Sequence, residues 1–220
     1  IDGGPDAGVV SSVGRALPFY DHTIELMVLT HAHADHVAGL VEVMKRYEVK
    51  HILYSGVMHE SAEFIAWHEQ IAAQAVPVTV AHAGQRFVFG QAALSVLYPQ
   101  ADISGQEFDD LNDSSVVTRL VYQDISFLFT GDAPIGVEEE MVRAYSNSLQ
   151  STVLKVGHHG SKYSSSLEFL QAVNPDYAVI QSGEDNRFNH PHRQVTRRLA
   201  GLGITTLRND ELGTITLESD

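Results

Sequence analysis

The segment His31-Ala32-His33-Ala34-Asp35-His36 holds four potential metal ligands and directly follows the apolar run of residues 25–30. In an extended chain, alternate side chains point the same way, so His31 and His33 can converge on one ion. Where the chain turns into the helix predicted at 37–47, Asp35 and His36 are directed at a second point nearby. An exposed polar loop is the weaker interpretation, because so many ligands directly follow a buried strand. The segment therefore predicts a fold that holds two divalent metal ions.

The composition narrows the ligand chemistry and the class of protein. The chain has no cysteine, so thiolate sites and disulfides are excluded, and imidazole with carboxylate suits manganese, zinc or iron. No apolar run reaches the roughly 18–20 residues that a membrane helix needs. The net charge of −14 argues against simple electrostatic binding of nucleic acid. Without such a run, we expect this chain to be soluble. Residues 1–5 resemble the end of a strand whose first part is missing, so we also expect the chain to be a piece of a longer protein.

Short apolar runs alternate with amphipathic stretches along the whole chain, which predicts two sheets packed face to face with helices outside, in one domain over residues 1–220. Residues 99–113 are polar and acidic and are expected to form a loop. Strands are expected at 25–30, 50–54, 78–80, 86–89, 93–97, 116–122, 125–130, 152–156, 177–181, 204–207 and 214–217, and helices at 37–47, 61–75, 134–145, 165–173 and 191–200.

The histidine cluster resembles the metal motif of the metallo-β-lactamase superfamily, whose fold is an α/β, four-layer αββα sandwich. Two later segments match further ligands of that family. Phe127 to Asp132 is an apolar strand ending in Gly-Asp, and the resemblance implies that Asp132 bridges both ions. Without the resemblance, Asp132 would be interpreted as a turn or helix-cap residue before a proline. Leu154 to Ser161 is a strand ending in two histidines. The resemblance favours His159 as the last ligand and makes His158 a supporting or catalytic group, with the reverse order left open.

One departure from the family pattern concerns the first ion. Many members place a third histidine ahead of the bridging aspartate, and the matching region, residues 111–117, has none. Asn112 is a neutral and weak oxygen ligand at best, so an open position is expected there, which catalytic sites require. The resemblance implies that one ion is held by His31, His33 and Asp132, and the other by Asp35, His36, Asp132 and His159.

A narrower resemblance is to the hydrolase domain at the carboxy-terminal end of ComEC, the competence DNA-uptake channel protein. The matching stretches are residues 1–5, 30–40, 112–117, 130–132, 154–161 and 186–192, which occur in the right order along nearly the whole chain. The resemblance implies a nuclease that acts on DNA, one strand of which it degrades during uptake. It also implies that the remainder of a membrane channel belongs to the parent chain and that the domain lies on the extracytoplasmic face.

Two cations about 3.5–4 Å apart can clamp both oxygens of an in-line displacement, which suits phosphodiester hydrolysis. Two other hypotheses remain, a phosphodiesterase for small substrates similar to phosphorylcholine esterases and a non-catalytic, metal-stabilised binding module of the channel. Lactam hydrolysis is the least favoured reaction.

The candidate catalytic residues are Asp35, which can accept a proton from water, His158, Lys162 and His190. The candidate substrate-binding residues are Asn112, Ser115 and Ser161. Manganese or zinc is the expected metal.

Overall fold

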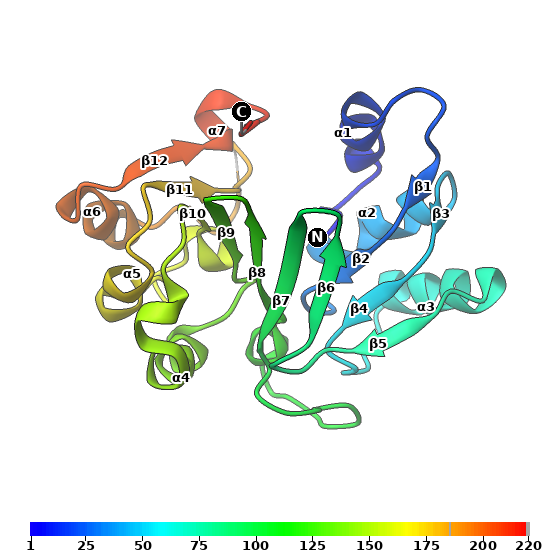
Figure 1. The fold of residues 1–220 in the computed structure, drawn as a ribbon, viewed down its shortest axis with the longest axis horizontal. Coiled ribbons are helices and arrows are strands. Elements are labelled where there is room, and N and C mark those ends of the chain that lie inside the picture. The colour runs from blue at the N-terminus through cyan, green and yellow to red at the C-terminus, as the bar shows by residue number, and fades with distance from the viewer. Residues whose placement is uncertain (185, 219–220) are drawn as a thin grey trace. The chain divides into compact units, whose positions relative to one another are not determined.

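The computed structural model describes residues 1–184 and 186–218. The chain divides into two compact units (Figure 1). The first unit comprises Ile1–His82 and Ala101–Val116, and the second comprises Ala83–Gln100 and Val117–Asp220. Each unit has its own sheet, its own helices and its own apolar core. The α/β class expected from the sequence is confirmed, whereas a single domain over 1–220 stays a prediction.

The first unit is built on short parallel strands. Its main sheet has the order β2-β4-β5, and a separate parallel pair joins β1 to β3. The elements are α1 (Gly8–Ala16), β1 (Thr23–Ile24), β2 (Met27–Leu29), α2 (Ala34–Met44), β3 (Glu48–Val49), β4 (Ile52–Tyr54), α3 (Ala62–Gln74), β5 (Val78–Val80) and the 3₁₀ turn η1 (Leu111–Ser114). The core of this unit joins one face of α2 to β2, β4 and α3, and Trp67 is its largest fully buried side chain.

The first residues of the chain pack against α2. The Gly3 amide donates to the carbonyl of His36 (2.8 Å), and the Gly39 amide donates to the carbonyl of Gly4 (2.9 Å). A Cβ atom on Gly39 would lie only 1.9 Å from the Gly3 carbonyl oxygen, so only glycine permits this approach. The Asp2 amide donates to Val28 on β2 (2.8 Å). These bonds hold Asp2 between the end of β2 and the start of α2.

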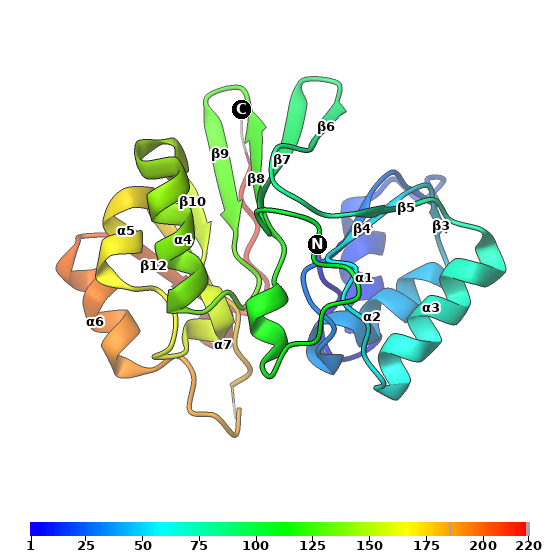
Figure 2. The same cartoon turned by 90° about the horizontal axis from the view of Figure 1, so that it is seen from below.

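The second unit contains a seven-stranded mixed sheet of order β12-β11-β10-β9-β8-β7-β6. Strands β6 to β9 are antiparallel neighbours, and β9 to β12 are parallel. Helices α4, α5 and α6 cover one face of the sheet (Figure 2) and pack on its core. The elements are β6 (Arg86–Phe89), β7 (Ala92–Tyr98), β8 (Val117–Tyr122), β9 (Ile125–Phe129), α4 (Ile135–Tyr145), η2 (Ser146–Leu149), β10 (Val153–Lys155), η3 (Gly157–Gly160), α5 (Leu167–Val173), β11 (Tyr177–Ile180), α6 (Arg193–Gly201), β12 (Thr205–Arg208) and α7 (Asn209–Leu212).

The parallel pairing of β9 with β10 brings together two loops that carry ligands expected from the sequence. Phe129 is in register with Lys155, so both strands end at the same edge of the sheet. The carboxyl ends of neighbouring parallel strands open into adjacent loops, and sites commonly form there. The loop after β9 carries Asp132, and the loop after β10 carries His159.

Two expectations about secondary structure were wrong. Residues 214–217 form no strand; the part of the sheet that is described ends at β12, and Leu217 is exposed. The helix α1 was not predicted, because its apolar positions, Val9, Val10 and Val13, are few and its ends are marked by no strong capping signal. The other expected strands and helices occur, with bounds that differ by up to three residues. The short elements β1, β3 and α7 were not expected either, and η1 begins within the stretch 99–113 that was expected to be a loop. Within the described residues, no helix has the length and hydropathy required to span a bilayer.

Candidate metal centre

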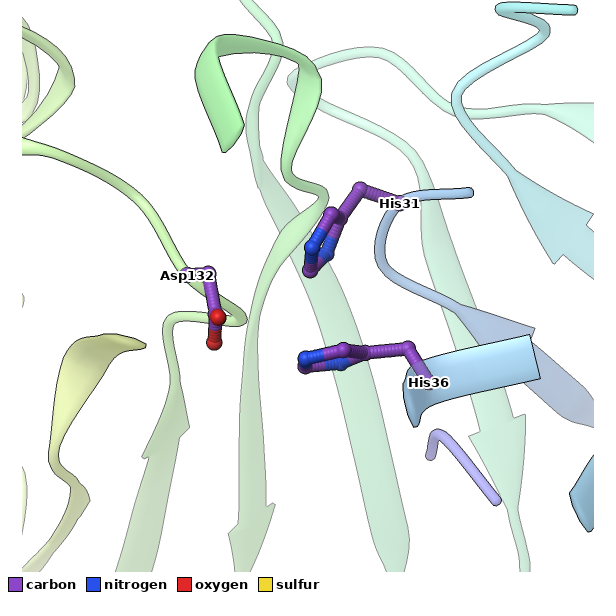
Figure 3. A group of neighbouring side chains, drawn as sticks. All are labelled: His31, His36 and Asp132. Carbon is purple, nitrogen blue, oxygen red and sulfur yellow. The ribbon is translucent and has the colours of Figure 1, made fainter. Parts of the chain in front are cut away.

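The histidine cluster occupies the turn from β2 into α2 (Figure 3 shows His31 and His36). His33 is the N-cap residue of α2, with extended backbone angles, and Asp35 lies in the first helical turn, where a carboxylate is stabilised by the helix dipole. His31 and His36 are buried, and their ring centroids are 4.1 Å apart. Nε2 of His31 lies 2.9 Å from Nδ1 of His33. Two nitrogens that bind the same ion, each at about 2.0–2.1 Å, lie a comparable distance from each other.

Asp2 and Thr30 orient the two buried imidazoles. Asp2 Oδ2 accepts from the Thr30 hydroxyl (2.9 Å) and from Nδ1 of His36 (2.9 Å), while Oδ1 accepts from the Thr30 amide (2.8 Å). Because an ionised carboxylate only accepts, Nδ1 of His36 must carry its proton. The Thr30 hydroxyl gives its single proton to Asp2 and therefore accepts from Nδ1 of His31 (3.0 Å). Both rings consequently present Nε2 with a lone pair, as metal coordination by that atom requires.

The same contacts keep Asp2 ionised. Burial works to raise the pKa of Asp2, but the neighbouring His36, together with the hydrogen bonds from His36 and Thr30, outweighs burial and lowers the pKa to about 2. At neutral pH, the carboxylate therefore accepts these hydrogen bonds in its charged form, which makes them stronger than neutral ones. A negative charge beside the imidazoles also increases their basicity as ligands.

In the second unit, Asp132 follows β9 after a tight turn at Gly131, whose φ is +53° (Figure 3). The side chain of Asp132 is buried. Lys155, the last residue of β10, is also buried; its ammonium donates to the Gly131 carbonyl (2.8 Å) and lies 3.5 Å from Asp132 Oδ1. Lys155 thus stabilises the turn and neutralises part of the charge of the Asp132 carboxylate. A buried charge without such a partner would destabilise the fold.

The two histidines after β10 have different surroundings. Both adopt left-handed backbone angles, with φ of 48° at His158 and 53° at His159, a conformation uncommon outside glycine. Nδ1 of His159 lies 2.7 Å from the Gln181 carbonyl oxygen, which only accepts, so this nitrogen is protonated and Nε2 has the lone pair. That Nε2 is 3.3 Å from Asp132 Oδ2. The ring of His158 instead meets the ring of His190 edge to face, with centroids 5.8 Å apart. These contacts favour His159 as the ligand, which stays a prediction.

The remaining predicted residues lie in both units. Asn112 and Ser115 are buried in and beside η1, and Asn112 Oδ1 has no hydrogen-bond partner among the described residues. Ser161 is buried directly after η3, whereas Lys162 is exposed, with its ammonium over the Tyr163 ring. His190 is half-buried; burial, followed by the nearby His158 and His159, lowers its pKa. None of these positions by itself tests the roles expected from the sequence.

A hollow of about 400 Å³ opens in the first unit beside the histidine cluster. Its lining includes His33, His59 and three acidic residues, Glu107, Asp109 and Asp110. An acidic wall attracts cations and repels phosphates that are not neutralised by a metal ion. The fit of a dication to this chain therefore rests on its donors, namely imidazole nitrogens of fixed tautomer and buried carboxylates, and on the unpaired amide oxygen of Asn112.

Sequence reasoning missed Asp2, Thr30, Lys155 and the Gln181 carbonyl. Asp2 lies far from the cluster in the sequence, and its only signal was the Asp-Gly-Gly turn that lets the chain approach α2. Lys155 was taken as part of an otherwise apolar strand. A charged residue in such a strand is itself a signal, because a buried lysine needs a partner.

Comparison with known proteins shows the family to which the chain belongs. The family model of the metallo-beta-lactamase superfamily matches residues 21–184. The chain is 31% identical to the ComE operon protein 3 of Bacillus subtilis (strain 168) over 193 residues, which are 87% of the chain and 24% of that protein. It is 34% identical to the competence protein ComA of Neisseria gonorrhoeae over 192 residues, which are 87% of the chain and 25% of that protein. The chain thus spans about a quarter of the length of these relatives, and the resemblance to the ComEC family is confirmed.

Solved structures support the fold alone. The metallo-beta-lactamase fold protein YhfI from Bacillus subtilis has a TM-score of 0.55 and 12% identity, covering 94% of this chain and 81% of that chain. The diiron β-hydroxylase CmlA from Streptomyces venezuelae has a TM-score of 0.56 and 13% identity, covering 88% of this chain and 44% of that chain.

Proposed function

The chain belongs to the metallo-beta-lactamase superfamily and is related to competence proteins, and we propose that it hydrolyses phosphodiester bonds with two divalent metal ions, manganese or zinc. One observation supports this most directly. His31, His36 and His159 each use Nδ1 in a hydrogen bond within their own unit, so the lone pair of each neutral ring lies on Nε2. Histidines that bind metal ions commonly donate the N–H of their other ring nitrogen to a carboxylate or a backbone carbonyl, as His36 and His159 do here.

The proposed ligand set is the one expected from the sequence. His31, His33 and Asp132 hold one ion, with Asn112 as a weak oxygen donor that leaves a position for substrate. Asp35, His36, Asp132 and His159 hold the other. Two bound dications would supply an activated water and neutralise the charge that develops on the phosphate.

The chain's own residues would position and protonate the substrate. Asp35 is exposed at the first turn of α2, where it can accept a proton from water. Ser161, buried after η3, and Lys162 can bind a phosphate oxygen. His158 and His190 meet edge to face, and either imidazole can protonate the leaving oxygen. Ser115, buried beside η1, is proposed to contact the substrate from the first unit.

We propose DNA, in single-stranded form, as the substrate. One curated relative, ComA of Neisseria gonorrhoeae, is a competence protein, and together with the resemblance to the ComEC family this supports a role in DNA uptake for the longer chain to which this domain would belong. That longer chain would include the membrane channel, with this domain on the extracytoplasmic face. The net charge of −14 requires the metal ions and a few local cations to hold the DNA backbone.

The decisive experiment joins metal analysis to a nuclease assay. The purified domain is loaded with Mn²⁺ or Zn²⁺, its metal content is measured, and single- and double-stranded DNA are offered. We expect two ions per chain and cleavage that is lost in Asp132→Asn but kept in Asp124→Asn, which removes an exposed acid from the turn between β8 and β9. A domain that binds two ions and leaves every phosphodiester intact would contradict the proposal and would support a non-catalytic, metal-stabilised binding module instead.

A small-substrate phosphodiesterase is the second candidate. The acidic composition and the acidic hollow beside His33 favour it, because both oppose a long polyanion. Turnover of a chromogenic phosphodiester without any cleavage of DNA would select this alternative.

A further inference from the structure

Two exposed aromatic rings flank the histidine turn η3 in the second unit. Tyr163 is 62% exposed and Phe188 is 63% exposed. Each ring has a cation over it from the preceding residue: the Lys162 ammonium is 4.9 Å from the Tyr163 centroid, and the Arg187 guanidinium is 4.9 Å from the Phe188 centroid. The same aromatic–cation pair therefore occurs twice beside one turn.

The segment that carries Phe188 is fastened to η3. The Asn186 side chain donates to the His190 carbonyl (2.7 Å) and accepts from the His190 amide (2.8 Å), which closes the loop. The His192 amide donates to the Gly160 carbonyl (2.8 Å), and a Cβ atom on Gly160 would lie 2.7 Å from Pro191. These contacts hold the segment around Phe188, whose ring remains exposed.

A series of ring contacts leads from Phe188 toward the proposed ligand His159. Phe188 stacks on His190 with centroids 5.7 Å apart and an interplanar angle of 25°. His190 meets His158 at 5.8 Å, and His158 immediately precedes His159. A large apolar ring that is exposed at the end of such a series has the form of a stacking platform.

We infer that Phe188 and Tyr163 stack against nucleobases on either side of the bond that is cut, with Arg187 and Lys162 pairing with the adjoining phosphates. This inference rests on the proposed function and specifies its substrate. A nucleotide combines a flat π face with a phosphate a short distance away, which matches an aromatic ring next to a cation. In a duplex the base faces are covered by neighbouring pairs, so these platforms favour a single strand. Together with bound metal ions, these two cations would help a chain of net charge −14 to hold a polyanion.

The test uses the metal-loaded domain with an oligothymidylate, the same oligomer with abasic sites, and its duplex with oligoadenylate. Stacking on one ring changes binding by about five- to a hundredfold, judged by alanine substitution. We expect wild type to prefer the oligothymidylate over the abasic oligomer and over the duplex. In Phe188→Ala and Tyr163→Ala, the ratio of kcat/KM for normal over abasic oligomer falls by about five- to a hundredfold. Phe188→Trp keeps this ratio.

Phe19→Ala is the matched control, because Phe19 is 91% exposed in the first unit and has the same side chain. Thermal unfolding of each variant checks its fold, and Phe188→Leu replaces Phe188→Ala if the latter does not fold. An unchanged ratio in the Phe188 and Tyr163 variants overturns the inference, as does a wild-type ratio near one. Turnover of a chromogenic diester without oligonucleotide cleavage also overturns it while leaving phosphodiester chemistry intact. A domain that cleaves no phosphodiester of any kind instead refutes the proposed function itself.

Discussion

Oδ2 of Asp2 accepts a hydrogen bond from Nδ1 of His36 at 2.9 Å, across 34 residues of sequence. The bond joins the opening turn of the chain to the first turn of α2. It fixes the tautomer of a histidine that would otherwise be free to protonate on either nitrogen. Asp2, which is not among the proposed ligands, thus determines which ring nitrogen of His36 keeps its lone pair.

We expect Asp2→Asn to weaken metal binding about 10–100-fold, since loss of such a supporting hydrogen bond has that effect. The asparagine can still accept from the Thr30 amide, but its NH₂ group opposes the proton on His36. Titration calorimetry with Zn²⁺ measures the change. Asp6→Asn, an exposed acid in the same segment, serves as control. Equal affinity in Asp2→Asn and wild type would contradict the positioning role.

His159→Ala and His158→Ala are expected to differ sharply. His159→Ala removes a proposed ligand and should reduce the bound metal from two ions to one, a larger loss than the roughly 10–100-fold effect of a supporting group. His158→Ala should keep both ions and lower kcat. Metal content after dialysis and steady-state rates are the two measurements. The opposite result would make His158 the ligand, the alternative that the sequence left open.

Lys155→Met is expected to destabilise the metal-free domain by about 2 kcal/mol, because the buried Gly131 carbonyl loses its donor and Asp132 loses its neighbouring cation. Saturation with Mn²⁺ should narrow the difference in Tm between wild type and Lys155→Met, since a bound dication would neutralise Asp132 in place of the ammonium. Lys162→Met, at an exposed lysine, is the stability control. A difference that widens on adding metal would show that Lys155 does not compensate Asp132.

Glu138 predicts a pH dependence remote from the metal centre. Burial raises the pKa of Glu138, although its carboxylate accepts from the Ser165 and Ser166 amides, which partly offset burial. A carboxyl whose folded pKa is raised binds its proton more tightly in the folded state. Its contribution to stability is therefore fully present below the ordinary pKa of 4.5 and is lost as pH rises through the folded pKa.

The measurement is urea unfolding of wild type and Glu138→Gln from pH 4 to pH 8. The stability of wild type relative to the variant should fall as the pH rises, because glutamine does not titrate. Glu139→Gln, an exposed acid on the same helix, should show no such trend. A relative stability that increases with pH would contradict the raised pKa.

The sequence by itself determined which residues are ligand candidates and where most strands and helices lie. The His31 to His36 cluster, Asp132 and the pair His158-His159 are local signals, because each directly follows an apolar strand. Strand and helix periodicity is likewise a property of neighbouring residues. The helix α1 was not predicted because its apolar stripe is short. Residues 214–217 were wrongly predicted to form a strand because an alternating pattern does not guarantee a partner strand.

Only the tertiary structure decided how these ligands are oriented. The proton on His36 is placed by Asp2, the proton on His159 by the Gln181 carbonyl, and the charge of Asp132 is balanced by Lys155. Each of these partners lies more than 20 residues away in sequence. Hydrogen bonds act over about 3 Å and require a defined direction, so no pattern of neighbouring residues can specify them. The six-residue cluster predicts a metal centre, and folding fixes which of its atoms can bind the ions.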